Sequence, residues 1–166
     1  VRHEIRAPSI AQVRIEDAQP LRSAGHAPDA APLQADAPAD EYIRVRLSDR
    51  VLFESGDDRI SEEGITVLAR LGAILKDEAN IQIAIQGHTD NKPIRDRLRH
   101  RFADNRALSQ ARASNASSIL ERSGVPLPWL SLQWFGESHP IAANDSEDSR
   151  RKNRRVEILI TPKESR

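Results

Sequence analysis

The sequence contains no cysteine and no methionine among its 166 residues. The absence of cysteine excludes disulfides, thiolate metal sites and cysteine nucleophiles, but it leaves the cellular compartment open. Neither sign of charge is in excess, because 25 lysines and arginines balance 25 aspartates and glutamates. With a formal net charge of zero, no long-range field attracts nucleic acid or an anionic membrane. Recognition by charge must therefore come from local clusters of side chains.

The chain also has no apolar run of the ~20 residues that a transmembrane helix needs, and it starts at Val1. Because it starts at Val1 and lacks methionine, we expect a processed or truncated product. The missing apolar run then says nothing about the parent protein's membrane anchor, which would lie upstream of Val1. A length of 166 residues allows one domain with a substantial core but is too short for two ordinary domains.

Residues 1–40 hold five of the ten prolines, and the segment 24–40 consists mostly of alanine, proline and aspartate. Such a composition buries little apolar surface, and each proline removes a backbone hydrogen-bond donor. We therefore predict a partly extended linker over 1–40, in preference to a structured subdomain, and one folded domain over 41–166. The first part of this linker is apolar enough to dock against another surface, through Ile5, Ile10, Val13 and Ile15.

Alternating apolar residues in the folded domain predict four strands. They cover 43–47, 81–87, 130–134 and 156–160. Apolar residues at helical spacing predict one helix after the N-cap Ser61, and a second helix through Leu108 that ends near Gly124. A short helix is expected to start near Asp145. Because strands and helices alternate, we predict an α+β fold with helices on one face of a mixed four-stranded sheet.

Two charged residues stand at the ends of these predicted elements. Asp90 lies just past the strand 81–87, and Arg112 lies near the start of the second helix. An acid and a base on two rigid elements could hold a zwitterionic ligand between them. They could equally form a salt bridge with each other.

Five segments, in order along the chain, carry a resemblance to a known family. They are Val-Leu-Phe-Glu-Ser-Gly at 51–56, Gly-His-Thr-Asp-Asn at 87–91, Asn105 with Leu-Ser-Gln-Ala-Arg-Ala at 108–113, Gly-Glu-Ser-His-Pro at 136–140 and Asn-Arg-Arg-Val-Glu-Ile at 153–158. Over residues 42–161 the chain resembles the OmpA-like peptidoglycan-binding domain, which also occurs in the flagellar stator protein MotB. The resemblance implies a two-layer β-α-β-α-β-type sandwich that binds peptidoglycan noncovalently, through the diaminopimelate of its stem peptide.

The resemblance also implies the roles of individual residues. Asp90 would bind the ammonium group and Arg112 the carboxylate at one end of diaminopimelate. The remaining lining residues would be Thr89, Asn91, Asn105 and Leu108. Guanidinium suits this role because it matches a carboxylate in a bidentate fork that lysine does not reproduce.

Arginines 154 and 155 lead into the last predicted strand. One of them is expected to face the pocket or to pair with an acid such as Asp104 or Glu137. We include Arg155 among the candidate ligand-binding residues on this ground.

The chain departs from the family pattern in two places. The stretch 92–104 is longer than the compact loop of OmpA, and it resembles stator-type members, which implies an anchor for a motor or secretion machine. Trp-Phe-Gly-Glu stands at 134–137, where family members usually have Gly-Tyr-Gly-Glu.

The long insert is rich in arginine, at Arg95, Arg97, Arg99, Arg101 and Arg106. This basic insert is either a solvated loop or a contact for anionic wall polymer, lipid headgroups or a partner subunit.

The sequence leaves three alternatives to wall binding. A metal site could use His88, Asp90 and His100, but the sequence offers no third anchored ligand at a recognisable spacing. A glycan hydrolase could use Glu54, Asp90 and Glu137, although the resemblance explains these segments without catalysis. A dimerisation or assembly module would form a homodimer and not bind the wall.

We expect a noncatalytic periplasmic anchor, without a cofactor, tethered to the inner or outer membrane. Its partner is peptidoglycan, and nucleic acid is not expected, because positive and negative charges balance along the chain.

Overall fold

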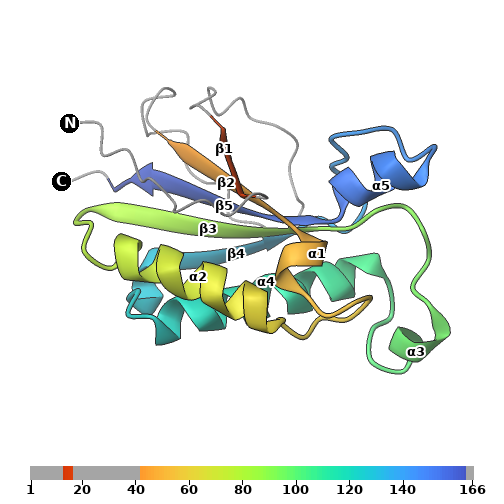
Figure 1. Ribbon diagram of the computed structural model, residues 1–166, viewed down its shortest axis with the longest axis horizontal. Coiled ribbons are helices and arrows are strands. Elements are labelled where there is room, and N and C mark those ends of the chain that lie inside the picture. The colour runs from red at the N-terminus through yellow and green to blue at the C-terminus, as the bar shows by residue number, and fades with distance from the viewer. Residues whose placement is uncertain (1–12, 17–41, 164–166) are drawn as a thin grey trace.

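The computed structural model describes residues 13–16 and 42–163, and a five-stranded sheet in the order β1-β2-β5-β3-β4 forms its centre (Figure 1). The strands are β1 Val13–Glu16, β2 Ile43–Ser48, β3 Ile81–His88, β4 Leu130–Trp134 and β5 Arg155–Pro162. The central strand β5 is antiparallel to both β2 and β3, whereas β3 and β4 are parallel. The predicted mixed four-stranded sheet is therefore confirmed as β2-β5-β3-β4, and β1 extends it beside β2.

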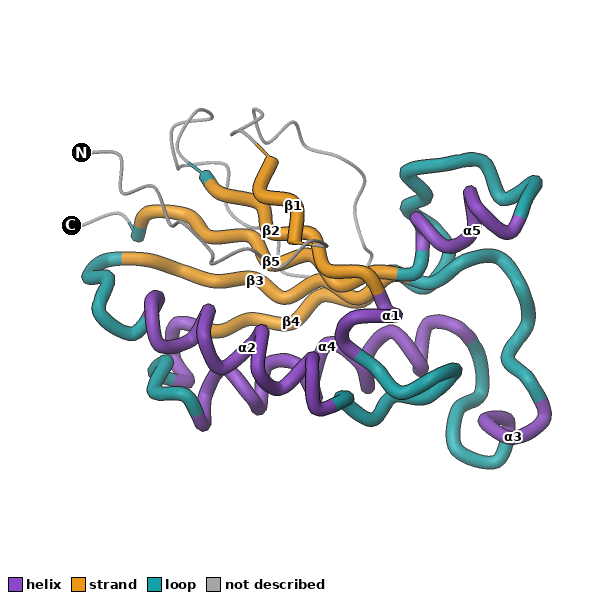
Figure 2. The backbone as a smooth tube through the Cα atoms, in the orientation of Figure 1, coloured by secondary structure: helices purple, strands orange, loops and turns teal. Residues whose placement is uncertain are grey.

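The helices complete an α+β fold, as the sequence predicts. They are α1 Asp49–Leu52, α2 Glu62–Leu75, α3 Asp96–Arg99, α4 Asn105–Arg122 and α5 Glu147–Asn153, with a 3-10 turn, η1, over Leu127–Trp129. The two long helices α2 and α4 lie side by side on one face of the sheet (Figure 2). The three short helices α1, α3 and α5 lie near the end of the sheet where β2 finishes.

Capping residues determine where the two long helices begin. The hydroxyl of Ser61 accepts a hydrogen bond from the backbone N–H of Gly64 at 3.0 Å, which confirms the predicted N-cap of α2. The carboxylate of Asp104 accepts one from Ala107 at 2.9 Å. Consequently α4 begins at Asn105, one turn before the apolar pattern that starts at Leu108.

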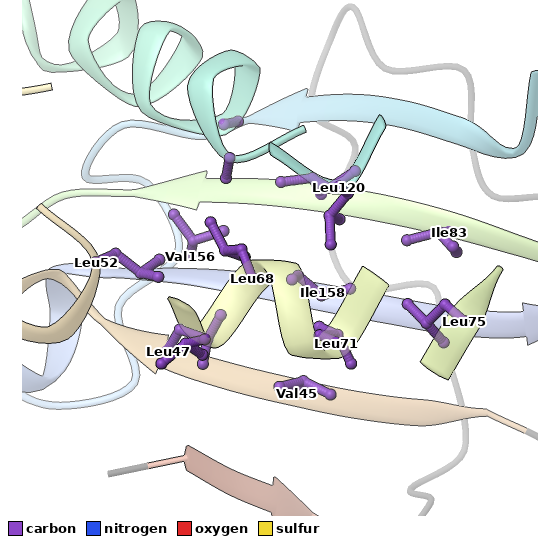
Figure 3. Close-up of a cluster of buried hydrophobic side chains, with 14 of the residues drawn as sticks. Val45, Leu47, Leu52, Leu68, Leu71, Leu75, Ile83, Leu120, Val156 and Ile158 are labelled. Carbon is purple, nitrogen blue, oxygen red and sulfur yellow. The ribbon is translucent and has the colours of Figure 1, made fainter. Parts of the chain in front are cut away.

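The core lies between the sheet and the long helices (Figure 3). Its sheet side includes Val45, Leu47, Ile83, Ile85, Val156 and Ile158, and its helix side includes Leu68, Leu71, Leu75 and Leu120. Burying each such aliphatic side chain contributes roughly 1.5–3 kcal/mol relative to leaving it exposed. The alternation of strands β2, β3 and β5 therefore fixes which face of the sheet the helices cover.

The strand β1 lies within residues 1–40, where the sequence predicts a linker. It pairs antiparallel with β2, with Val13 opposite Leu47 and Ile15 opposite Val45. The proline-rich composition gives no signal for this strand, although Val13 and Ile15 are among the residues that we expect to dock. The other residues of 1–40 lie outside the described ranges, so the linker and the domain boundary at residue 40 stay predictions.

Within the described ranges, none of the helices combines the length and the apolar character needed to span a lipid bilayer.

Candidate functional site

A cleft of about 550 Å³ opens at the end of the sheet where β2 and β3 finish and β5 starts. These three termini meet because β5 runs antiparallel to both neighbours. Asp49 directly follows β2, Thr89 directly follows β3, and Arg154 directly precedes β5. The start of α4, the insert 92–104 and residues 50–56 supply most of the remaining wall. Four segments that are distant in sequence therefore contribute to one site.

Asp90 lies on the wall that follows β3, and it is only 7% exposed. One carboxylate oxygen, Oδ1, accepts a hydrogen bond from the backbone N–H of Lys92 at 3.0 Å. The other oxygen, Oδ2, accepts one from Nη1 of Arg154 at 2.7 Å. A carboxylate has about four lone-pair sites, so Asp90 keeps acceptor capacity for a ligand while its orientation is fixed.

Arg112 projects from the first half of α4 into the same cleft, and it is 4% exposed. Its Nε and Nη2 donate to the backbone carbonyl of Asp57 at 3.1 and 2.9 Å. The guanidinium carbon lies 4.7 Å from the centre of the Phe53 ring. These contacts leave the Nη1 group, 3.7 Å from Oδ2 of Asp49, and one N–H of Nη2 available to a ligand.

Arg154 joins three acids at the cleft. It donates to Asp90 and to Glu147, each at 2.7 Å, and its Nε lies 3.4 Å from Oδ2 of Asp49. The charge of Arg154 and its hydrogen bond hold the pKa of Glu147 below the usual value. Arg154 thus compensates the carboxylates around the binding position and aligns Asp90.

Burial changes the ionisation of two groups in the cleft. It raises the pKa of Asp49, against the opposing charges of Arg112 and Arg154. It lowers the pKa of Arg112, although arginine stays protonated at all physiological pH values. A permanent positive charge held away from bulk water forms strong, charge-assisted hydrogen bonds with an incoming carboxylate.

The arginine-rich insert is attached to the rest of the domain at two points. Ile94 and Leu98 pack with Leu108 of α4 in a small apolar cluster. Arg101 pairs with Asp58 at 2.8 Å. The insert therefore forms part of the wall, and one of its arginines has an internal structural role.

Comparison with known proteins identifies the family. The OmpA family model matches residues 52–154. The chain belongs to the OmpA family. This OmpA-family chain is 34% identical over 124 residues to Motility protein B of Bacillus subtilis, a match that covers 74% of the chain and 46% of that protein.

Two solved structures show the same fold. The periplasmic domain of Helicobacter pylori MotB is 31% identical, with a TM-score of 0.67 over 75% of this OmpA-family chain and 76% of that one. The cell wall anchor of the T6SS from Pseudomonas aeruginosa is 26% identical, with a TM-score of 0.71 over 92% of this chain and 90% of that one. The chain spans about half the length of the MotB-type curated relatives that it matches.

The OmpA-family cleft brings together most of the residues predicted from sequence. Its lining includes Thr89, Asp90, Asn105, Leu108 and Arg112. Within this group, the side-chain amide of Asn105 donates to the backbone carbonyls of Asp90 and Lys92, at 3.3 and 2.9 Å. Asn105 therefore joins the start of α4 to the loop after β3. Whether these five residues bind a ligand stays a proposal.

Two predicted residues of the OmpA-family site do not line the cleft. Asn91 is exposed on the loop after Asp90 and is absent from the lining residues. Placing Arg155 in the cleft is wrong, because its guanidinium donates to the backbone carbonyls of Asn153 and His139 instead. Arg155 alternates with the core residue Val156, so it lies on the sheet face away from α2 and α4. The neighbouring Arg154 occupies the cleft in its place.

Asp49 and the carbonyl of Asp57 contribute to the site, and neither is predicted from the sequence. Asp49 reaches the cleft because β2 ends at Ser48 and α1 turns the chain directly afterwards. A backbone carbonyl that accepts from Arg112 leaves no signal in a sequence. The one sequence signal for a role of Asp49 in the cleft is its position directly after the first predicted strand, which ends at the same edge of the sheet as the strand before Asp90.

The residues considered for a metal site and for a glycan hydrolase do not all come together in this OmpA-family structure. His88 lies on the sheet face away from the helices, in register with Arg155, whereas Asp90 lines the cleft. In the described part of the chain, no group of three His, Cys, Asp or Glu side chains is arranged to hold a metal ion. Glu54 and Asp90 both line the cleft, but Glu137 is exposed and is not among its lining residues.

His88 belongs to a buried polar cluster on that face of the OmpA-family sheet. Its Nε2 lies 3.3 Å from Oε2 of Glu157, and its ring stacks on Phe135 with centroids 5.0 Å apart. Burial lowers the pKa of His88 to about 4, with the charge of Arg155 acting in the same direction. Burial acts to raise the pKa of Glu157, but the contact with His88 and the charge of Arg155 outweigh it and lower that pKa.

We expect this histidine to destabilise the domain in mild acid. The unfolded chain binds a proton at His88 near pH 6.5, whereas the folded domain resists protonation until about pH 4. Stability that is present above pH 6.5 is therefore lost as the pH falls from 6.5 to 4. Between pH 6.5 and 4.5, the expected loss that comes from His88 is about 2 kcal/mol. Glu157 adds a smaller loss near the lower end of this window, because its pKa is 4.5 in the unfolded chain and lower in the folded domain. Urea unfolding at both pH values measures it.

His88→Gln should flatten this pH dependence, because the neutral amide does not titrate. His100→Gln is the matched control, since His100 is exposed on the insert. An equal loss of stability in wild type and His88→Gln between the two pH values would contradict this assignment.

Proposed function

We propose that the cleft binds peptidoglycan noncovalently through the diaminopimelate of the stem peptide, and that the domain anchors a membrane protein or a motor or secretion complex to the cell wall. The observation that carries the proposal is that Asp90 and Arg112, from two different elements, line one cleft. Among the described residues, no ion pair or hydrogen bond joins them to each other. Their opposite charges are therefore presented separately to a ligand.

The chemistry of diaminopimelate fits this arrangement. One end of the molecule carries an ammonium and a carboxylate on the same carbon, and the pair matches one acid and one guanidinium side by side. The ammonium would donate to Asp90, and the carboxylate would accept from Nη1 and Nη2 of Arg112. Each charge-assisted hydrogen bond contributes about 1.5–3 kcal/mol.

The relatives support a mechanical role. One similar structure is the periplasmic domain of MotB, and another is a cell wall anchor of the T6SS. A periplasmic location and attachment to a membrane through the rest of the parent protein are part of the proposal. Because the wall presents many copies of the ligand, a tethered domain needs only modest affinity at a single site.

Cosedimentation with purified cell wall tests this function. We expect the domain to sediment with walls that contain diaminopimelate, and much less with walls that contain lysine, which lacks the second carboxylate. Free diaminopimelate should compete. Asp90→Asn should weaken binding roughly tenfold or more, because it removes a charge from the ammonium position while it preserves the shape of the side chain.

Asp77→Asn is the matched control, since Asp77 is exposed beyond the end of α2 and is not among the lining residues. Thermal unfolding of both variants separates binding from folding. The site assignment fails if Asp90→Asn and Asp77→Asn bind the wall equally well.

A further inference from the structure

The mouth of the cleft carries more positive than negative charge. Its lining includes six cationic residues, Arg50, Lys92, Arg95, Arg112, Arg151 and Arg154, and four acidic ones, Asp49, Glu54, Asp90 and Glu147. Arg112 and Arg154 lie deep and contact acids of the cleft. The excess positive charge therefore belongs to the outer residues, and the diaminopimelate site does not use it.

Two of these outer cations, Arg50 on α1 and Arg95 before α3, are exposed. Within the described part of the chain, neither guanidinium forms a hydrogen bond or an ion pair. By contrast, Arg97 and Arg101 of the same insert contact Ser55 and Asp58. Arg50 and Arg95 thus remain available to an anion in the cleft.

The backbone fixes the position of Lys92 relative to Asp90. The N–H of Lys92 donates to Asp90, and its carbonyl accepts from Asn105 at 2.9 Å. Its side chain is exposed at the cleft, where its charge helps to lower the pKa of Glu147. The apolar contacts of Ile94 with Leu108 hold the adjoining insert against α4. The cationic mouth is therefore attached to the same framework as the inner site.

We propose that Arg50, Lys92 and Arg95 form a second subsite, which binds the free carboxylates of the residues that flank diaminopimelate in the stem peptide. This inference rests on the function proposed above and deepens it. The domain would then distinguish stem peptides with free flanking carboxylates from peptides in which these groups are amidated.

The size and lining of the cleft support a ligand larger than one zwitterionic end. A volume of about 550 Å³ lies within the range of sites that hold drug-sized ligands. Apolar side chains among the lining residues can contact the methylene chain of diaminopimelate; they include Ile94, Leu98 and Leu108. The peptide end of the residue, with its neighbouring carboxylates, would then reach the mouth.

Each contact in this subsite is solvent-exposed and therefore individually weak, as surface ion pairs are. Three such contacts together correspond to roughly fivefold to tenfold in affinity. They are also sensitive to salt. The cationic residues of the mouth would determine the preference between peptides, while Asp90 and Arg112 supply most of the binding free energy.

Calorimetry with two synthetic stem peptides tests the inference. Both peptides carry unmodified diaminopimelate, and they differ only in whether the flanking carboxylates are free or amidated. We expect wild type to bind the free form roughly fivefold to tenfold more tightly. The triple variant Arg50→Gln, Lys92→Gln, Arg95→Gln should bind both forms with the affinity that wild type has for the amidated form.

A matched triple variant removes the same charge elsewhere, at the exposed residues Arg70, Lys76 and Arg122. It should keep the wild-type preference. The inference is overturned if wild type binds both peptides equally, or if the mouth variant keeps the preference. It is also overturned if the mouth variant loses only binding to anionic lipid vesicles, which would assign these cations to a membrane. If wild type binds neither peptide, the proposed function itself fails.

Discussion

Arg112→Ala is expected to abolish detectable binding to the cell wall. The substitution removes the only buried arginine among the residues that line the cleft, and in the described structure its Nη1 forms no hydrogen bond. A bidentate bond to a carboxylate is lost, and the acids Asp49 and Asp90 are left to repel the ligand's carboxylate. Together these effects should lower the affinity for the cell wall about a hundredfold or more. Cosedimentation and calorimetry with a diaminopimelate peptide measure it.

Two further variants separate binding from structure in this experiment. Arg112→Lys keeps the charge but cannot form the planar fork, so it should restore little binding. Arg155→Ala is the contrasting variant, because Arg155 is equally buried but lies on the other face of the sheet. It should destabilise the domain and leave wall affinity unchanged. Wall binding that survives Arg112→Ala and is lost in Arg155→Ala would reverse the placement of the site.

Gly87→Ala is expected to cost about 3 kcal/mol or more in the free energy of unfolding, and it can prevent folding. A methyl group at this position in β3 would overlap the backbone carbonyl oxygen of Ser109 in α4 and lie 2.9 Å from its carbon. Because the obstacle is backbone, no rotamer relieves it, and the helix must move away from the sheet. The displaced helix carries Arg112, so wall affinity should fall as well. Urea unfolding measures the loss of stability.

Gly56→Ala provides the comparison for this result. An added methyl group there meets no atom of the described structure within 4 Å, although the backbone has a φ of 67°. The free energy of unfolding should therefore fall by only about 1 kcal/mol, because alanine is less stable than glycine in the left-handed backbone conformation. Equal destabilisation by the two substitutions would show that the contact between β3 and α4 is not unusually close.

The strands and long helices could be predicted because their apolar residues repeat at clear periods. Ile81, Ile83 and Ile85 alternate with more polar residues, and the resulting strand packs against the helix that bears Leu120. The strand β1 could not be predicted in this way. Its residues 13–16 have only two apolar side chains in a proline-rich surrounding, and its pairing with β2 depends on tertiary structure.

The site was partly predictable for a different reason. Asp90 and Arg112 belong to motifs that resemble a family, and the structure places both in one cleft. The choice between Arg154 and Arg155 was partly open to the sequence. Val156, Ile158 and Ile160 alternate towards the core, so Arg155 belongs to the opposite face of the sheet. The sequence could not show that Arg154 reaches the cleft, because Arg154 precedes β5 and its position depends on how the chain leaves α5.

The position of the cleft relative to β2 has a mechanical consequence. A pulling force that enters at residue 42 and leaves through a ligand beside Asp49 acts along the whole of β2. The hydrogen bonds between β2 and β5 lie perpendicular to the strands, with paired residues from Ile43 to Ser48. Such a load shears these bonds in parallel and does not peel them apart one at a time, so the strand next to the cleft is well placed to resist tension.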